Sequence, residues 1–283
     1  MNIIVVGGTG QLGQCLQEAI KTKKTDYNFI FLSSKDLNYT DQEQTAAIFR
    51  KYIPVFCLNC AAYTAVDLAE DEKEQAFAVN QYAVRNLAEQ CNLYNTTLIH
   101  ISTDFVFNGD CSVPLTEELP VNPVNVYGLS KLKGEQEIQG ILEKHYIIRT
   151  SWLYSENAAN FVKTMLNLAK NRDHLSVIYD QVGTPTYAMD LANIILKFIA
   201  LEQPLYGLYH YSNEGVASWY DFAKAVFEFA EVDMKITPVS SAAFVTRAKR
   251  PHFSVLDKSK IKAALNIEIP YWRDSLNRCI QRI

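Results

Sequence analysis

The sequence predicts an α/β fold, a Rossmann-type doubly wound parallel sheet with a smaller C-terminal substrate-binding lobe. Short apolar runs alternate with helical patterns from the first residue, as expected for parallel strands joined by helices. A glycine-rich turn follows the first of these runs. The alternation changes past Ser155. We therefore expect a dinucleotide-binding domain at 1–154 and mainly the lobe at 155–283, with about 185–212 returning to the first domain.

The first domain should contain five strands, because five short apolar runs are followed by turn residues or helical patterns. These runs are 2–6, 28–34, 55–62, 97–103 and 145–152. The helix after the first run has its apolar residues at Leu12, Leu16, Ala19 and Ile20. Further helices are expected at 40–52, with Thr40 or Asp41 as the cap, at 72–91, and from Tyr127 onward.

The second part of the chain should mix helices with two short strands. Helical patterns cover 161–170, 189–201 and 218–231, and strands are expected at 175–181 and 207–213. The helix at 218–231 should bury a stripe formed by Trp219, Phe222, Val226 and Phe229.

Composition excludes several classes of protein. The 283 residues are 48% apolar and carry a net charge of −4, which argues against a general nucleic-acid binder. No apolar stretch reaches the roughly 20 residues of a membrane span, and the N-terminal run is too short for a signal peptide. Six scattered cysteines suit a reducing compartment, so we expect a cytoplasmic protein.

Two motifs contain residue types that bind metals, and we expect no metal at either. The C-x-x-C of Cys57 and Cys60 lacks the second pair or nearby histidine that would complete a zinc site. The acidic run 67–74 is interpreted as a solvated loop whose carboxylates favour a helix N-terminus.

The glycine-rich turn predicts a phosphate-binding loop. Gly7, Gly10 and Gly13 lie between the first strand and the first helix. Glycines there allow a tight turn, close approach of the backbone to a pyrophosphate and close helix–strand packing. The helix N-terminus adds a positive dipole end. A purely structural turn is the alternative, but this position directly after an apolar strand favours a dinucleotide.

The end of the second strand favours NADPH. NAD-binding chains usually place an acidic residue there for the ribose hydroxyls. This chain has Ser33, Ser34 and Lys35, and the lysine could attract a 2′-phosphate. Asp36 follows directly, so NADH stays open as an alternative.

Two Tyr–Lys pairs at helical spacing are candidates for a proton-donating centre: Tyr127 with Lys131, and Tyr220 with Lys224. The ligands of a doubly wound sheet gather at the carboxyl ends of its strands. Tyr127 opens the helix that follows the fourth strand, which ends at Thr103. Location therefore favours the first pair. The alternatives are salt bridges of Lys131 to Glu135 and of Lys224 to Glu228, or a Lys224 side chain that extends into water.

These residue types suit the reduction of a ketone, which needs a proton for the developing alkoxide. A free tyrosine has a pKa of about 10 and holds its proton at neutral pH. A lysine one turn away should stabilise the tyrosinate and lower that pKa. A hydroxyl such as that of Thr103 can donate a second hydrogen bond to the same oxygen.

The glycine loop with Thr103, Tyr127 and Lys131 resembles the extended short-chain dehydrogenase/reductases. The segments NCAAYTAVDLAE, STDFVFNG, NVYGLSKLKGE, RTSWLYS, DQVGTPTY and KRPHFSVLDKSK are together similar to the dTDP-4-dehydrorhamnose reductases within that family, nearly end to end. The resemblance implies NAD(P)H-dependent reduction of the 4-keto group of dTDP-4-dehydro-L-rhamnose to dTDP-L-rhamnose. The expected partner is therefore a dTDP-linked 4-keto-6-deoxy sugar, and a homodimer is left open.

The resemblance also implies site residues. Thr103, Tyr127 and Lys131 would be catalytic. Besides the glycines, Tyr127 and Lys131, the cofactor would be lined by Gln11, Leu12, Asp36, Leu37, Ala62, Tyr63 and Thr64, which adds to Ser34 and Lys35 at the end of the second strand. Thr103, Asp104 and Trp152 would contact the sugar nucleotide, and Arg250 its diphosphate, because a buried dianion needs a fixed cation.

Two departures from the family limit the transfer. Many relatives have a glutamate after the third glycine that is linked to a magnesium ion (Mg2+) at a subunit contact, whereas this chain has Gln14 and Cys15. Relatives also tend to have Asn-Ser after the late Arg-Pro, where this chain has His252, Phe253 and Ser254. The use of magnesium therefore stays open.

Three rival functions remain: a nucleotide-sugar dehydratase, an epimerase of the same fold, and a non-catalytic regulatory subunit that retains the fold. By resemblance, a dehydratase should follow its Thr-Asp with a glutamate, and this chain has Phe105. The complete set of Thr103, Tyr127 and Lys131 counts against a regulatory subunit.

Overall fold

The computed structural model describes residues 1–23 and 25–283. Its centre is a parallel sheet of six strands in the order β10-β5-β4-β3-β1-β2. The strands are β1 (Asn2–Val6), β2 (Asn28–Leu32), β3 (Phe56–Asn59), β4 (Thr97–Thr103), β5 (His145–Thr150) and β10 (Gly207–His210). The predicted doubly wound sheet is confirmed. Strands β2, β3 and β5 end earlier than predicted, because the chain leaves the sheet at its carboxyl edge to form loops.

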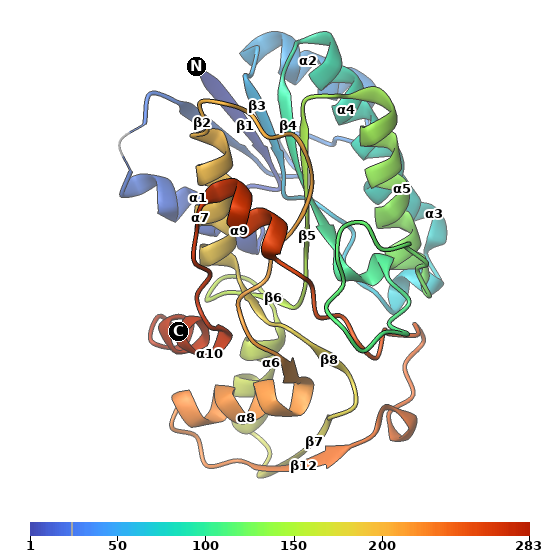
Figure 1. Cartoon of the computed structure of the whole chain (residues 1–283), viewed down its shortest axis with the longest axis vertical. Helices are drawn as coiled ribbons and strands as arrows, with labels where there is room; N and C mark the ends of the chain where they lie inside the picture. The colour runs from blue at the N-terminus through green and yellow to red at the C-terminus, as the bar shows by residue number, and fades with distance from the viewer. Residues whose placement is uncertain (24) are drawn as a thin grey trace.

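Helices cover both faces of the sheet (Figure 1). One face carries α2 (Gln42–Tyr52), α3 (Lys73–Phe77), α4 (Ala83–Leu93) and α5 (Val126–Ile141), and the other carries α1 (Gln11–Lys21), α7 (Ala188–Ile199) and α9 (Ser259–Leu265). Asp41 is the N-cap of α2 and accepts a hydrogen bond from the Gln44 N–H, so one of the two predicted caps is confirmed.

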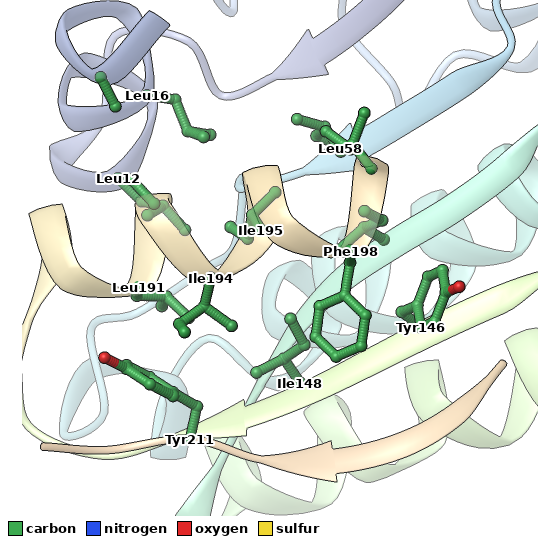
Figure 2. Packing of buried hydrophobic residues seen from close by; sticks show 14 of the residues in the cluster. Leu12, Leu16, Leu58, Tyr146, Ile148, Leu191, Ile194, Ile195, Phe198 and Tyr211 are labelled. Carbon is green, nitrogen blue, oxygen red and sulfur yellow. The ribbon is translucent and has the colours of Figure 1, made fainter. Parts of the chain in front are cut away.

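The core between the sheet and α7 explains why this late helix belongs with the first half of the chain. Figure 2 shows Leu191, Ile194, Ile195 and Phe198 of α7 lying between α1 and the sheet. Phe198 stacks at a tilt on Tyr146 of β5, with ring centroids 4.6 Å apart. Strand β10 then pairs with β5. The segment 185–212 thus contributes a helix and a strand to the sheet layer, whereas the domain boundary at residue 154 stays a prediction.

The helix predicted at 72–91 is interrupted. Helix α3 is followed by a π-helical turn, Ala78–Tyr82, before α4 begins. Within this turn the Asn80 side chain bonds to the backbone of Tyr63 and to Ser130 on α5. A Cβ at Gly134 of α5 would collide with the Asn80 carbonyl. Tertiary packing against α5 therefore accounts for the break, which an amphipathic pattern does not reveal.

The remaining elements form the smaller lobe, which lies beyond the carboxyl ends of the sheet (Figure 1). Its helices are α6 (Phe161–Ala169), α8 (Trp219–Phe229) and α10 (Trp272–Ile280). Its short strands form the pairs β6 (Leu153–Tyr154) with β9 (Thr186–Tyr187), β7 (His174–Ile178) with β12 (Lys235–Val239), and β8 (Val182–Gly183) with β11 (Ala217–Ser218). In the described part of the chain, no helix combines the length and apolar character needed to cross a bilayer.

Helix α8 confirms the helix predicted at 218–231. Ser218 is its N-cap and forms a capping box with Asp221. Phe222 and Val226 are fully buried in the core of the lobe. Trp219 and Phe229 are only partly buried, so both ends of the predicted stripe are partly exposed to solvent.

Candidate active site

The glycine-rich turn between β1 and α1 packs so tightly that two of its glycines leave no room for a side chain. Gly7 has a φ of +79°, and a Cβ there would lie 2.7 Å from the backbone nitrogen of Ala61. A Cβ on Gly13 would lie 2.6 Å from the Gly8 carbonyl oxygen. A Cβ on Gly10, the N-cap of α1, would meet only the Gly7 carbonyl oxygen, at an ordinary contact distance of 3.4 Å, and no side chain of the described residues caps this helix. The turn therefore offers bare helix N–H groups, which fits a pyrophosphate.

The next two residues of the loop face different ways. The Gln11 side chain accepts hydrogen bonds from Ser155 at 3.1 Å and from Asn160 at 3.0 Å, and so links α1 to the start of α6. Leu12 is 4% exposed and belongs to the core beneath the sheet. For Leu12, contact with a cofactor would therefore come from its backbone.

The turn after β2 contains a carboxylate, Asp36, that is bonded to another residue of the same turn. Asp36 accepts hydrogen bonds from the Ser33 N–H at 2.9 Å and from the Ser33 hydroxyl at 2.6 Å, and these bonds lower the pKa of Asp36. Ser34 and Lys35 are exposed at the tip of the turn, while Leu37 is buried below it. Lys35 is thus free to reach a ligand phosphate from the sheet edge, which keeps its assignment to a 2′-phosphate as a prediction.

Ala62, Tyr63 and Thr64 lie in the loop after β3, beside the glycine turn. Asn80 holds this loop by accepting from the Tyr63 N–H at 2.9 Å and donating to the Tyr63 carbonyl at 3.0 Å. It also donates to Ser130 Oγ on α5 at 3.0 Å. Asn80 therefore fixes one wall of the predicted cofactor site. Sequence reasoning missed it, because only the π-helical turn distinguishes this asparagine from others.

Thr103 and Tyr127 come together at the carboxyl edge of the sheet. Thr103 is the last residue of β4, and Asn125 caps α5 so that Tyr127 lies in its first turn. Burial raises the pKa of Tyr127 to about 12, a hydrogen bond with Thr103 opposes this, and the charge of Asp104 adds to it. The ring of Phe105 contacts that of Tyr127 edge to face, with centroids 5.5 Å apart. The phenol is thus held protonated beside a second hydroxyl.

Asp104 is a buried carboxyl group next to this pair. It is 2% exposed, and burial raises its pKa to about 6 although hydrogen bonds, one of them with Thr103, lower it. Its Oδ1 accepts from the Thr103 hydroxyl at 3.1 Å. Its Oδ2 is buried and makes no hydrogen bond of normal geometry among the described residues, although the Ser254 hydroxyl is near enough to the carboxyl group to oppose the rise in its pKa. A ligand hydroxyl is the kind of group that would satisfy it.

Lys131 lies deeper than the tyrosine and bonds to the sheet. Its Nζ donates to the carbonyl of Ile101 at 2.6 Å and lies 3.2 Å from Nε2 of His100. Burial lowers the pKa of Lys131 to about 8, although Glu135 and Cys60 raise it. The sequence predicts that Lys131 lowers the pKa of Tyr127. In this structure the Tyr127 pKa is instead raised, because burial dominates.

Glu135 pairs with Arg149 and not with Lys131, so the salt-bridge alternative for Lys131 is wrong. Arg149 Nη2 lies 2.6 Å from Glu135 Oε2, and Nε donates to Oε1 at 2.9 Å. Ser102 donates to the same carboxylate. The two charged side chains are only 4% and 1% exposed. This buried ion pair joins α5 to β4 and β5 directly behind the candidate site.

Trp152 is held where the chain passes from β5 into the lobe. It has a φ of +47°, uncommon for a bulky residue, and its ring stacks on Trp219 of α8 with centroids 3.6 Å apart. A Cβ at Gly183 would lie 2.9 Å from the Trp152 ring. The predicted sugar-contacting residue is therefore fixed by packing from two elements of the lobe.

Arg250 is bound to a carboxylate in this structure. Its guanidinium forms a two-bonded pair with Asp67, at 2.5 and 3.1 Å, and this pair lowers the pKa of Asp67. Arg247 pairs with Asp71, and the Ala248 N–H donates to Asp67 at 3.0 Å. The expected diphosphate contact of Arg250 would thus compete with an ion pair that ties the late segment to the loop after β3.

The run 67–74 is largely exposed and leads into α3, as predicted, but several of its carboxylates also have distant partners. Besides Asp67 and Asp71, Glu70 accepts from the N–H of Val126 at 2.8 Å, at the start of α5. Glu72 accepts from the Tyr63 hydroxyl at 2.9 Å. These carboxylates connect the segments around the candidate site, and local sequence could not reveal their distant partners.

The second Tyr–Lys pair lies elsewhere. Tyr220 lines a groove of about 430 Å³ in the lobe, together with Tyr179, Val216 and Pro238. Lys224 is exposed on α8. Glu228, its expected partner, binds Arg273 through two contacts of 2.8 Å. The alternative in which Lys224 extends into water therefore fits the structure.

Among the described residues, no group of three or more histidine, cysteine, aspartate or glutamate side chains could hold a metal ion. Gln14 donates to the Thr9 carbonyl at 2.7 Å, and Cys15 is buried, which raises the pKa of its thiol to about 12. Burial likewise raises the pKa of Cys60 to about 12. These protonated thiols are poor metal ligands.

Comparison with known proteins agrees with this geometry. The family model described as RmlD substrate binding domain matches residues 1–283. A dTDP-4-dehydrorhamnose reductase of Aggregatibacter actinomycetemcomitans is 38% identical, covering 97% of this chain and 96% of its own length. One from Escherichia coli strain K12 is 39% identical, covering 100% and 98%.

A solved structure shows the same fold. The crystal structure of dTDP-4-dehydrorhamnose reductase from Bacillus anthracis, in complex with NADP, superposes on this chain with a TM-score of 0.95. The two sequences are 38% identical, and the match covers 100% of this chain and 99% of that one.

Proposed function

This chain belongs to the family of the RmlD substrate binding domain, and we propose that it reduces the 4-keto group of dTDP-4-dehydro-L-rhamnose to give dTDP-L-rhamnose. The electron donor is NADPH. The observation that carries this proposal is the placement of Thr103 and Tyr127 at the carboxyl edge of the sheet, together with relatives of this activity over the full length of the chain. The proposed location is the cytoplasm, since the six cysteines are all thiols.

The residues around the glycine turn fit a dinucleotide. Gly7 and Gly13 close the turn, and Gly10 leaves the α1 N–H groups open for a pyrophosphate. Lys35 is the proposed contact for the 2′-phosphate, and Ala62, Tyr63 and Thr64 line the side towards β3. Bound NADPH supplies the hydride for the carbonyl carbon.

The proton comes from Tyr127. Its raised pKa keeps the phenol protonated at neutral pH, so that it can donate to the oxygen of the sugar ketone as negative charge develops there. The Thr103 hydroxyl, which donates to Asp104 in the ligand-free chain, turns to donate a second hydrogen bond to the same oxygen. Lys131 lies one turn further along α5 and stabilises the tyrosinate that remains.

The sugar nucleotide is held by groups from both sides. The unpartnered Oδ2 of Asp104 accepts from a sugar hydroxyl, and the Trp152 ring covers the sugar. Arg250 binds the diphosphate: it gives up some of its hydrogen bonds to Asp67 and donates to phosphate oxygens instead.

A dehydratase is disfavoured by Phe105. In a dehydratase the residue after the Thr-Asp pair would be a glutamate that works as acid and base. Here that residue is Phe105, whose apolar ring packs against Tyr127. The chain then lacks the side chain that would remove a proton from the sugar carbon.

The test is NADPH consumption by the purified protein, followed by absorbance. We expect oxidation of NADPH with the dTDP-linked 4-keto sugar, and dTDP-L-rhamnose as the product. Protein that leaves this sugar untouched, or that dehydrates dTDP-glucose, would contradict the proposal.

A further inference from the structure

Behind Lys131 a row of polar side chains runs through the sheet. Asn59 is the last residue of β3, His100 lies in the middle of β4, and Lys131 projects from α5. The first two are fully buried and the lysine is 1% exposed. Neither Asn59 nor His100 belongs to the predicted site, and their hydrogen bonds determine what Lys131 meets.

The orientation of Asn59 is fixed by the backbone. Its Oδ1 accepts from the N–H of Ala61 at 3.2 Å. Its Nδ2 then faces Nδ1 of His100 at 3.0 Å. The opposite orientation would place an amide N–H₂ against the Ala61 N–H, two donors face to face. Asn59 is therefore a donor to His100.

This donor selects the tautomer of His100. Since Nδ1 accepts a hydrogen bond, the proton of the neutral imidazole is assigned to Nε2 by the hydrogen-bond network. The ring is neutral because burial, and then the charge of Lys131, hold its pKa well below the usual range. The Nε2–H therefore points at Nζ of Lys131, 3.2 Å away.

An ammonium group has three donors and no acceptor, whereas an amine has a lone pair. Lys131 already donates to the Ile101 carbonyl at 2.6 Å. A donor from His100 is satisfied only by the amine. We propose that Asn59 and His100 are positioning residues that present an N–H donor to Lys131 and favour its neutral amine form before the cofactor binds.

The charged groups around Lys131 favour its ammonium form, and burial opposes them. Glu135 on α5 raises the Lys131 pKa, but its carboxylate is paired with Arg149 of β5. Cys60, in the loop after β3, raises the Lys131 pKa as well. Burial outweighs both and lowers the pKa of Lys131 to about 8. At pH 7 the ammonium is therefore still the major form, and the amine that His100 favours becomes the major form above pH 8.

The catalytic consequence rests on the proposed function. An anionic cofactor and a developing tyrosinate both favour the ammonium, so the fraction of Lys131 present as amine takes up a proton from solvent as they form. His100 then sets how easily that proton is gained. Its hydrogen bond acts through Lys131 and does not reach the reacting atoms.

The tautomer can be observed without any activity. Nitrogen-15 NMR of the histidine side chains in the cofactor-free protein distinguishes a protonated from an unprotonated ring nitrogen. We expect His100 to be neutral with its proton on Nε2 from pH 5 to 8, identified by its contact with the Asn59 amide. A proton on Nδ1, or titration near the usual pKa of about 6.5, would overturn the proposal.

The second measurement is the pH profile of kcat/KM for NADPH, which reports groups of the free enzyme. In His100→Gln the amide can turn its oxygen towards Lys131, so the ammonium should become more stable. The alkaline limb should then move upward by about one pH unit, the shift that corresponds to one hydrogen bond. A loss of rate at every pH with an unmoved limb would show a merely structural His100.

These two measurements distinguish a failure of the proposed function from a failure of the assignment of His100. If the protein has no reductase activity, the proposed function fails while the NMR result still tests the assignment of His100. If His100→Gln does not fold, the wild-type spectrum alone decides, because it needs no variant.

Discussion

Helices α5 and α8 each carry a tyrosine and a lysine four residues apart, yet their surroundings differ completely. Lys131 is 1% exposed and bonds to the sheet, whereas Lys224 is exposed. Tyr127 lies beside Thr103 at the carboxyl edge of the sheet, while Tyr220 borders a groove of the lobe. Helical spacing places the tyrosine and the lysine one turn apart in both cases. Only the sheet topology puts one pair in a buried environment at the carboxyl edge of the sheet.

The carboxylates one turn further along the two helices repeat the contrast. Glu135 and its partner Arg149 are almost fully buried. Glu228 is 60% exposed and its partner Arg273 is 31% exposed. The same i, i+4 pattern therefore supports a rigid interior on α5 and a solvated helix face on α8. The predictions that follow use this contrast.

The largest difference in stability should come from these two acids. Glu135→Gln leaves Arg149 as an unpaired buried cation, which typically costs about 3–5 kcal/mol. Glu228→Gln breaks an exposed pair and should change the free energy of unfolding by about 1 kcal/mol or less. Urea denaturation of both variants measures the difference. Equal losses would mean that the buried pair contributes no more than a surface pair.

Two aspartates should act on stability in opposite directions. The folded pKa of Asp104 is raised from 3.8 to about 6, so its stabilising protonation is complete below the unfolded pKa and is lost as the pH rises through 6. Asp104→Asn should therefore be more stable than wild type by about 3 kcal/mol at pH 7.5. At pH 4 the gain should shrink to less than about 1 kcal/mol.

The matched residue on α8 is Asp221, which accepts from the N–H and hydroxyl of Ser218 in the capping box. Asp221→Ala should destabilise the protein by about 1 kcal/mol. Thermal unfolding at the two pH values checks both variants. A gain for Asp104→Asn that does not depend on pH would rule out its titration as the cause.

The smallest effect should come from an exposed lysine of each region. Lys35→Glu should weaken NADPH more than NADH by about 1 kcal/mol, since only NADPH carries the extra phosphate. Lys224→Glu, an exposed charge on α8, should leave both affinities unchanged. Titration of cofactor fluorescence gives the dissociation constants. If Lys35→Glu weakens both cofactors equally, another residue selects between them.

Much of the fold was accessible from sequence because its elements are locally determined. The apolar run 2–6 is strand β1, and the run 97–103 is strand β4, since buried parallel strands are nearly continuous in apolar residues. The glycine turn was equally clear, because a tight helix–strand junction needs glycine. Location at the carboxyl edge also selected Tyr127 over Tyr220.

What sequence did not reveal depends on distant partners. The pairs Glu135–Arg149 and Asp67–Arg250 join residues 14 and 183 positions apart, beyond the reach of helical spacing. The π-helical turn at Asn80 arises from packing against α5. The role of His100 depends on a hydrogen bond from Asn59, one strand away. Such features follow from the assembled sheet and not from any local pattern.

The comparison of the two tyrosines is tested most directly by the turnover rates of Tyr127→Phe and Tyr220→Phe with NADPH and the dTDP-linked 4-keto sugar. Both changes keep the ring and delete one hydroxyl. Tyr127→Phe should lose about 10²–10⁴ in rate, as expected for a missing general acid, while its affinity for NADPH changes little. Tyr220→Phe should retain nearly full activity. If Tyr127→Phe keeps more than about a tenth of the wild-type rate, or if Tyr220→Phe loses as much, the pair on α5 is not the proton-donating centre.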